Sequence, residues 1–369
     1  MEVYEDLGVR HVINAWGPMT IIGSARVRPE VIEAMAEAAH NYVDVIELQR
    51  AAGQRLAEMI GVQACYIAGG TAAGLAIAMA ATMTGTDRGL ITRLPDTTGM
   101  KNEVIMQRNH RNSYDHAFRQ VGVRIVEFGN AWRSFDWELE ACITPATAAV
   151  VYVYGSRTMH EPLSLPETVA IAHAHGLPVL VDAAAEVPPV RNLRGLYDTG
   201  ADIVVISGGK GLRGPQNSAI VQTRPEMIEA LILNAAPNHC HGRSMKTTKE
   251  DMVGLVKAVE LFLALDHDAV AAGWKQDVAT VVAAVAGIEG IDAEPALARY
   301  SEGIPVARLT VDAAVFGASA ADIAAALAAG DPSLRVMQSH DWLNIDPQFL
   351  QEGDVALVVA RLREVLGAA

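Results

Sequence analysis

A lysine surrounded by glycines follows a short apolar run, and this segment most limits what the chain can fold into. Residues 202–206 are expected to form a buried strand, and Ser207-Gly208-Gly209-Lys210-Gly211 follow directly. Glycines allow a backbone to approach a ligand closely, and a lysine desolvated in such a turn can act as a nucleophilic amine. A plain turn with a solvated lysine fits the segment equally well. A phosphate-binding P-loop requires Ser or Thr after the lysine, where this chain has Gly211.

Short β-rich runs alternate with helical patterns through the first two thirds of the chain. Such alternation predicts an α/β fold with a mostly parallel sheet and helical crossovers. The expected helices include Thr71–Thr82 and Pro166–His175. The expected strands are Ala64–Ala68, Glu103–Gln107, Val123–Phe128, Ala148–Tyr152, Pro178–Asp182, Asp202–Ile206 and Ser218–Gln222.

The pattern changes near Lys249, where long helices rich in Ala and Val begin. They are followed by expected strands at 305–311 and 334–338 and by helices at 319–329 and 354–366, which indicates a second, smaller α/β domain. A chain of 369 residues also exceeds what one compact core usually holds. We therefore expect an N-terminal segment 1–45 that packs with the small domain, a large domain 46–248 and a small C-terminal domain 249–369. The aperiodic stretch 86–101 is long enough to act as a lid.

The composition is that of a folded globular protein and excludes several classes of function. Apolar residues make up 51% of the chain, yet no apolar run is long enough to span a bilayer. The formal net charge of −14 repels polyanions, so we expect no nucleic-acid partner. The acidic N-terminus lacks the features of a secretion signal, and three scattered cysteines favour a reducing compartment. We expect a cytoplasmic location and no membrane partner.

Asp182 ends an otherwise apolar run, Val179-Leu180-Val181, that lies upstream of Lys210. Ligands of α/β proteins bind at the carboxyl ends of the strands. A buried carboxylate needs a partner, and the protonated nitrogen of a pyridine ring is one. The alternative is an aspartate that caps the following helix.

Two further segments follow expected strands. Gly69-Gly70-Thr71 precede a helix, so free N–H groups and the Thr71 hydroxyl could hold a phosphate. His110 follows the strand Glu103–Gln107, and its ring could stack on a cofactor. Each segment also fits an ordinary turn or solvated loop. The loop Asn238-His239-Cys240-His241 contains possible zinc ligands, but it lacks a second ligand pair, so we expect no metal.

Together these residues resemble the fold-type-I enzymes that use pyridoxal 5′-phosphate (PLP). They resemble more narrowly the selenocysteine synthase-like group, which includes D-glucosaminate-6-phosphate ammonia-lyases. The segments that carry the resemblance are Val12–Thr20, Tyr66–Leu75, Asn102–Ala117, Gly176–Glu186, Ile206–Gln216 and Gly242–Ala258. The resemblance implies the aspartate aminotransferase-like fold of PLP-dependent transferases, with PLP as the cofactor.

The resemblance also implies a role for each matching residue around the cofactor. Lys210 is expected to form the Schiff base and to move the proton at Cα, and Asp182 to pair with the pyridine nitrogen. Gly70, Thr71 and Ser207 are expected to bind the cofactor phosphate. His110 lies where related enzymes place a stacking ring, and it could also assist departure of the leaving group.

Several cations are candidates for the substrate's anionic groups. Arg335 is the candidate for the substrate carboxylate, because fold-type-I enzymes commonly use an arginine on a strand of the small domain. The planar fork of a guanidinium suits a carboxylate. Further candidates, each equally compatible with a solvated surface cation, are Arg157, Arg213, Arg243 and Lys249.

The ammonia-lyase resemblance predicts α,β-elimination from an amino acid or amino sugar acid, giving a 2-oxo acid and ammonia. Racemisation or epimerisation, transamination and aldol cleavage start from the same loss of a group at Cα and remain open. A PLP-binding protein without catalysis is the alternative of another class. The resemblance further implies a homodimer or larger homo-oligomer, because fold-type-I sites usually lie where two subunits meet.

Overall fold

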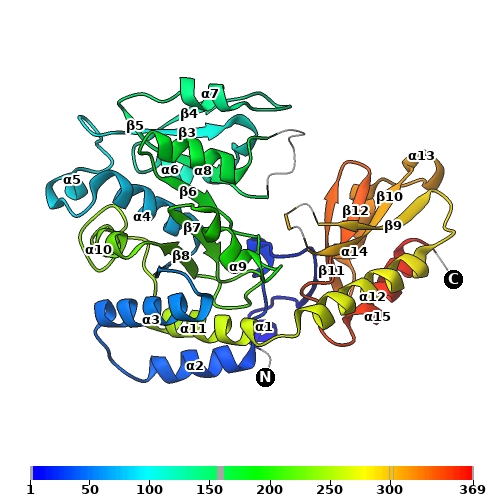
Figure 1. The fold of residues 1–369 in the computed structure, drawn as a ribbon. Coiled ribbons are helices and arrows are strands. Elements are labelled where there is room, and N and C mark those ends of the chain that lie inside the picture. Colours follow the sequence, from blue (N-terminus) through cyan, green and yellow to red (C-terminus); the bar gives the residue numbers. More distant parts are fainter. Residues whose placement is uncertain (1–2, 156–161, 299, 302, 368–369) are drawn as a thin grey trace. The chain divides into compact units, whose positions relative to one another are not determined.

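The computed structural model describes residues 3–155, 162–298, 300, 301 and 303–367, and these divide into two compact units (Figure 1). The larger unit is Val27–Ala264, and the smaller comprises Met1–Arg26 and Leu265–Ala369. These limits differ from the expected boundaries at residues 45 and 249. The helices α2 (Pro29–Ala39) and α11 (Lys249–Leu263) belong to the larger unit, because they pack against each other there.

The larger unit is built on a seven-stranded sheet with the strand order β2-β8-β7-β6-β5-β3-β4. The four pairings from β7 through β6, β5 and β3 to β4 are parallel, and β8 is antiparallel to both of its neighbours. The mostly parallel sheet predicted from the sequence is therefore confirmed. Its strands are β2 (Ala64–Ala68), β3 (Glu103–Gln107), β4 (Arg124–Phe128), β5 (Thr147–Val153), β6 (Val179–Asp182), β7 (Ile203–Ser207) and β8 (Ala219–Thr223).

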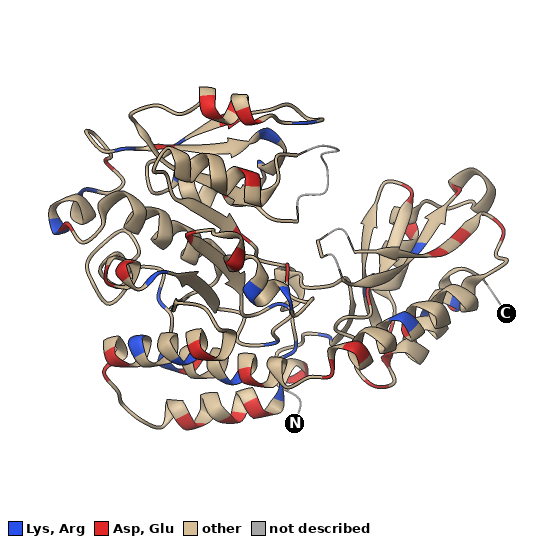
Figure 2. Ribbon diagram, viewed as in Figure 1, with Lys and Arg blue, Asp and Glu red and all other residues tan. Residues whose placement is uncertain are grey.

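The helices of the larger unit cover this sheet and supply most of its core. Their bounds, with α2 and α11 given above, are α3 (Val45–Ile60), α4 (Thr71–Thr84), α5 (Arg88–Arg93), α6 (His116–Arg119), α7 (Asp136–Ala141), α8 (Leu165–Ala174), α9 (Asn192–Gly195) and α10 (Pro225–Leu233). Short 3-10 helices lie at Arg108–His110 (η2), Ser113–Asp115 (η3) and Tyr197–Thr199 (η4). Lys and Arg are interspersed with Asp and Glu along α3 and α11, whereas the charged residues of α2 are all Glu (Figure 2).

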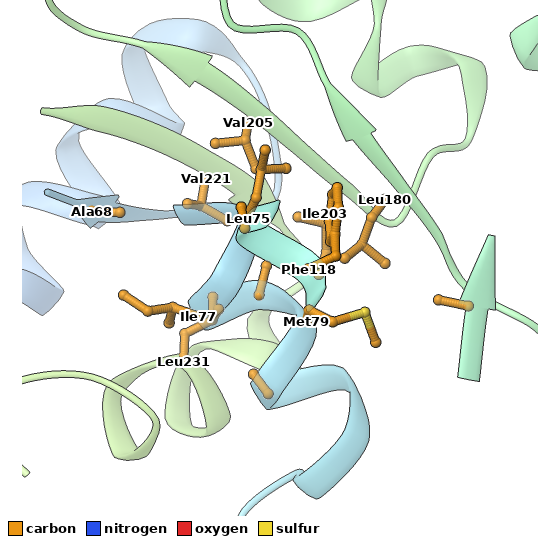
Figure 3. Packing of buried hydrophobic residues seen from close by; sticks show 14 of the residues in the cluster. Ala68, Leu75, Ile77, Met79, Phe118, Leu180, Ile203, Val205, Val221 and Leu231 are labelled. Carbon is orange, nitrogen blue, oxygen red and sulfur yellow. The ribbon is translucent and has the colours of Figure 1, made fainter. Parts of the chain in front are cut away.

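Helix α4 is the centre of the large core. It contacts β2, β5, β6, β7 and β8, and every residue from Gly74 to Ala81 is buried. Leu75, Ile77 and Met79 project from α4 among side chains of the neighbouring strands and helices (Figure 3). Small side chains make this depth possible, because a methyl group at Gly74 would lie 3.0 Å from Val205. The helix that starts at Thr71 is thus anchored in the core.

The smaller unit carries a five-stranded sheet in the order β1-β11-β12-β10-β9. β1 pairs with β11 in parallel, and the other pairings are antiparallel. The strands are β1 (Val12–Ala15), β9 (Ile291–Leu297), β10 (Pro305–Val311), β11 (Ser333–Ser339) and β12 (Trp342–Ile345). The helices are α1 (Val3–Asp6), η1 (Thr20–Ile22), α12 (His267–Val285), α13 (Ala313–Phe316), α14 (Ala320–Ala329) and α15 (Asp354–Val365).

Some elements match the sequence predictions and others were not predicted. The limits of β2, β3 and β10 are those expected. Two strands were not predicted from the sequence: β9, an edge strand with a largely solvent-accessible pattern, and the four-residue β12. The stretch 86–101 contains α5, whose first turn is capped by Asp87 and whose Ile91 is buried. Among the described residues, no helix has both the length and the apolarity needed to cross a membrane.

Gly53 gives a stability test of how closely α3 packs on β2. A methyl group at Gly53 would lie 2.1 Å from the carbonyl oxygen of Cys65. Gly-to-Ala changes inside helices ordinarily stabilise by about 0.5–1 kcal/mol. Here the backbone must shift, so we expect Gly53→Ala to lower the free energy of unfolding by about 1–3 kcal/mol. Urea denaturation followed by circular dichroism measures it.

Gly195→Ala is the matched control in the same unit, because nothing lies within 4 Å of the added methyl. It should change the free energy of unfolding by less than about 0.5 kcal/mol. Equal effects of the two substitutions would contradict the close packing of α3 on β2.

Candidate active site

The strand directions bring the predicted residues to one edge of the large sheet. Because β8 is antiparallel to both β2 and β7, β2 runs in the same direction as β7, β6, β5 and β3. The carboxyl ends of these five strands therefore share an edge, where ligands of α/β folds bind. Thr71 follows β2, His110 follows β3, Asp182 ends β6 and Lys210 follows β7.

Lys210 lies in a tight turn that only glycine can form at several positions. A methyl group at Gly209 would lie 2.4 Å from the Cα of Gln216, and one at Gly211 would lie 2.0 Å from the carbonyl oxygen of Val187. The Arg213 amide donates to the Lys210 carbonyl at 2.9 Å, and Arg213 has a left-handed φ of 55°. The glycines around Lys210 thus bring its backbone against neighbouring segments.

Asp182 is buried and Lys210 is half-buried, and each acts electrostatically on the other. Asp182 is 7% exposed, and its Oδ1 accepts from the Ala184 amide at 3.1 Å. Burial raises the pKa of Asp182, while the Ala184 amide and the Lys210 ammonium act in the opposite direction. Burial likewise lowers the pKa of Lys210, and Asp182 and Glu186 oppose this shift. Each residue is in a site that disfavours its charge unless a partner is present.

Gly70 and Thr71 form the amino-terminal end of α4. Gly70 has a φ of 95°, which favours glycine, and nothing lies within 4 Å of where its Cβ would be. The Thr71 hydroxyl oxygen is buried without a hydrogen-bond partner within the part of the chain that the structure describes. An unpartnered hydroxyl at a helix amino terminus suits a phosphate, which offers acceptor oxygens.

His110 lies beside the residues that flank Asp182. Its Nδ1 accepts from the Val153 amide at 3.2 Å, and Val153 pairs in register with Asp182. The ring is 2% exposed and meets Tyr152 edge-on at 4.5 Å between centroids. Burial lowers the pKa of His110 to about 4, so the ring is neutral at pH 7 and Nε2 carries the hydrogen. This state suits ring packing better than proton donation.

The chemistry of these groups fits PLP. Thr71 and the first turn of α4 offer donors for a phosphate, Asp182 offers a carboxylate for a protonated ring nitrogen, and Lys210 offers an amine for the aldehyde. Ser207, the last residue of β7, is buried, and its amide donates to the Ala184 carbonyl at 3.4 Å. All these residues belong to the larger unit.

The candidate anion-binding residues occupy different places. Arg335 belongs to the smaller unit, on β11, and its Nε is buried without an acceptor among the residues described there. Lys249 donates to the Ala38 carbonyl at 2.5 Å, which ties α11 to α2. Arg28, not selected from the sequence, donates to the Leu212 carbonyl at 2.9 Å. Burial and the neighbouring Arg213 lower the pKa of Arg28 to about 10. Arg157 lies outside the described residues.

A cavity of about 270 Å³ adjoins the turn before α4, and its lining includes Arg243 and Lys246. The Lys246 carbonyl lies 2.7 Å from where a Cβ of Gly69 would be. The lining contains neither Lys210 nor Asp182, so the cavity is a neighbour of their site. Within the described ranges, no group of three or more His, Cys, Asp and Glu could hold a metal ion.

Sequence reasoning gave no role to Glu186, which lies in the same site. This carboxylate is 3% exposed and acts electrostatically on Lys210. Its position four residues after Asp182 is part of no spacing rule, so only the three-dimensional arrangement reveals it.

Comparison with known proteins places the chain among enzymes. Residues 12–271 match the family described as L-seryl-tRNA selenium transferase. The D-glucosaminate-6-phosphate ammonia lyase of Salmonella typhimurium (strain 14028s / SGSC 2262) is 37% identical over 371 residues, which cover 98% of this chain and 97% of the relative. A solved structure of D-glucosaminate-6-phosphate ammonia-lyase, 36% identical, superposes with a TM-score of 0.86 and covers 100% of this chain and 99% of that chain.

Two other similarities differ in sequence identity and therefore in what they show. A 5′-C-glycyluridine monooxygenase-decarboxylase of a Streptomyces species is 37% identical over 374 residues, or 98% of this chain and 92% of the relative. The serine palmitoyltransferase of Sphingomonas wittichii, 16% identical, aligns with a TM-score of 0.59 over 92% of this chain and 84% of that chain. The latter supports the fold alone, and the predicted fold-type-I architecture is confirmed.

His110 makes stability depend on pH. Its pKa is about 4 in the folded chain, against 6.5 for the unperturbed group, so the unfolded chain binds more protons between these values. The contribution of neutral His110 is therefore complete above pH 6.5 and is lost as the pH falls towards 4. We expect this residue alone to account for about 2 kcal/mol of stability lost between pH 7 and pH 5.

His110→Gln replaces the titrating imidazole with an amide that does not titrate in this pH range. The glutamine side-chain oxygen can still accept a hydrogen bond from the Val153 amide. Urea denaturation at pH 7 and pH 5 should show a smaller pH effect for the variant than for the wild type. His175→Gln, at a solvent-exposed histidine, is the control and should leave the wild-type pH effect in place. An unchanged pH effect in His110→Gln would contradict a neutral buried ring.

Proposed function

Since this chain belongs to the L-seryl-tRNA selenium transferase family, we propose that it is a PLP-dependent lyase that removes a β-substituent from an amino sugar acid or a related amino acid. The products would be a 2-oxo acid and ammonia. The observation that carries the proposal is the placement of Asp182, Lys210 and Thr71 at one edge of the sheet, where the Thr71 hydroxyl has no hydrogen-bond partner among the described residues. The 37% identity to an ammonia lyase over nearly the whole chain supports the reaction class.

Asp182, Thr71 and the first turn of α4 would hold the cofactor in the proposed site. When bound, PLP supplies an aldehyde for amino groups and a protonated ring that withdraws electrons from Cα. Asp182 would hold the proton on the ring nitrogen, because a buried carboxylate favours a cationic partner. The Thr71 hydroxyl and the free amides of α4 would hold the phosphate.

Lys210 would act as the base at Cα of the substrate. Burial lowers its pKa, so a larger fraction of the amine is unprotonated at neutral pH than for a solvated lysine. The close packing of Gly209 and Gly211 limits the backbone positions from which the amine can approach. A base that is both positioned and partly unprotonated meets the requirements for abstraction of a proton.

Arg335 would bind the substrate carboxylate. Its Nε is buried without an acceptor within the described part of the smaller unit, which is costly unless a ligand supplies one. A carboxylate matches the two parallel donors of a guanidinium.

A second candidate is oxidative decarboxylation of a glycyl nucleoside, because the monooxygenase-decarboxylase relative is equally identical. Elimination releases ammonia without consuming oxygen, whereas a monooxygenase consumes oxygen. Measuring oxygen uptake together with ammonia release separates the two reactions. Exchange of the Cα hydrogen with deuterium oxide, without either product, would instead favour a racemase, epimerase or aldolase. Binding of PLP without turnover or exchange would favour the non-catalytic alternative.

We also propose that the protein acts on small molecules in the cytoplasm as a homodimer or larger homo-oligomer. All three cysteines are free of disulfides, which suits a reducing compartment. The net charge of −14 disfavours a tRNA substrate.

Lys210→Ala tests the assignment of the base. With D-glucosaminate 6-phosphate as substrate, we expect kcat for release of the 2-oxo acid and ammonia to fall by about 10³-fold or more. The variant should also lose the visible absorption of lysine-bound cofactor. Lys101→Ala, at a solvent-exposed lysine, should keep both properties. Wild-type turnover or covalently bound cofactor in Lys210→Ala would rule out this role.

Arg335→Lys tests the carboxylate contact, because lysine keeps the charge but lacks the planar fork. We expect KM to rise by about 10- to 100-fold, the loss typical of a hydrogen bond to a charged group. Arg10→Lys, at an exposed arginine of the same unit, is the control and should leave KM unchanged. An unaltered KM in Arg335→Lys would place the carboxylate elsewhere.

A further inference from the structure

Glu186 occupies a position that two glycines make possible. A methyl group at Gly155 would lie 2.0 Å from Oε1 of Glu186, and Gly155 has a left-handed φ of 81°. On the other side, a methyl group at Gly211 would lie 2.0 Å from the carbonyl oxygen of Val187, the next residue. The segment Glu186–Val187 is thus held between the end of β5 and the turn that carries Lys210.

The Glu186 carboxylate is as deeply buried as any charged group of the site. It is 3% exposed, and its Oε2 is inaccessible to solvent. The charged groups that act on the Lys210 amine are Asp182, from β6, and Glu186. Two acids therefore act electrostatically on one lysine.

The charges of the proposed reaction indicate a role for the second acid. In the proposed site, Asp182 is committed to the protonated ring nitrogen of the cofactor. The lone pair of Lys210 Nζ would take the Cα proton and Lys210 would become an ammonium, while the electron pair of the broken C–H bond would stay on Cα, where a bound PLP ring would supply electron withdrawal. A buried ammonium without a nearby anion is strongly unfavourable. The site then contains two cations, and Asp182 can neutralise only one of them.

We propose that Glu186 is a positioning residue that acts through Lys210, as the counter-ion of the ammonium formed when Lys210 takes the Cα proton. This inference rests on the proposed function for its place in the reaction. Glu186 would lower the barrier to proton abstraction without contacting the substrate. Gly155 would help to position Glu186, because only a residue without a side chain leaves room for the carboxylate.

The first experiment uses the cofactor-free protein and measures how the charge of Glu186 affects the protonation of Lys210. Competitive labelling with limiting acetic anhydride, followed by mass spectrometry, gives the pH dependence of Lys210 acetylation relative to the exposed Lys101. In Glu186→Gln, the loss of a nearby negative charge should move the midpoint for Lys210 about one pH unit lower. Lys210 should then react about tenfold faster below that midpoint.

The second experiment measures turnover of the holoenzyme. Glu186→Gln should lower kcat by about 10- to 100-fold, because the ammonium loses its partner, while KM changes little. The conservative variant Glu186→Asp keeps the charge. Its kcat and its pH midpoint for Lys210 labelling should therefore lie between those of Glu186→Gln and the wild type. Glu140→Gln, an identical change at an exposed acid of α7, should match the wild type in both experiments.

Gly155→Ala provides an independent variant that leaves Glu186 in place. Its methyl group must displace the carboxylate, so the labelling midpoint should move in the same direction as in Glu186→Gln. A labelling curve for Glu186→Gln that superposes on that of the wild type would overturn the proposal. So would a shifted curve combined with an unchanged kcat, because the charge would then have no part in the reaction.

Labelling requires neither substrate nor cofactor, so it separates this inference from the proposed function. If no elimination substrate is turned over while the midpoint still shifts, the proposed reaction fails and the electrostatic coupling of Glu186 to Lys210 stands. If elimination occurs and the midpoint does not shift, the proposed function stands and the counter-ion role fails.

Discussion

The electrostatic interaction between Asp182, which ends β6, and Lys210, which follows β7, is the constraint on which this edge of the sheet depends. Asp182 and Lys210 both lie where burial works against their charges. Such a pair is rarely worth its desolvation cost as a stabilising contact, and a fold that keeps it must hold both partners in place. The parallel pairing of β6 with β7 and the glycine turn provide this restraint. Stability obtained in the apolar core offsets the cost of the site.

Along this edge of the sheet, the end of each strand supplies a different kind of chemical group. The amino terminus of α4, after β2, provides donors for an anion, and the ends of β6 and β7 provide the charged pair. Between β3 and β5, the neutral His110 packs against Tyr152 and accepts the Val153 amide. Electrostatic environments therefore differ over neighbouring strand ends, which lets one small region hold an anion, a cation and an uncharged ring.

The residues that follow buried strands could be predicted from the sequence, and those placed by loops could not. The apolar runs 64–68 and 103–107 have limits that match β2 and β3, and this fixed the neighbourhoods of Thr71 and His110. Glu186 carries no such signal, because its position depends on the φ of Gly155 and on the path after β6. The unit limits near residues 26 and 264 were also inaccessible, since α2 and α11 belong to the larger unit through packing that no composition change marks.

The depth of α4 has a consequence for how the anion-binding end of the site behaves. A helix whose residues 74–81 are all buried against several strands can detach only when the core itself opens. Amide hydrogens of that helix would then exchange with solvent through global opening, and the donors ahead of it would stay ordered in the free protein. A ligand that arrives there meets a preorganised cradle, so little conformational entropy is lost on binding.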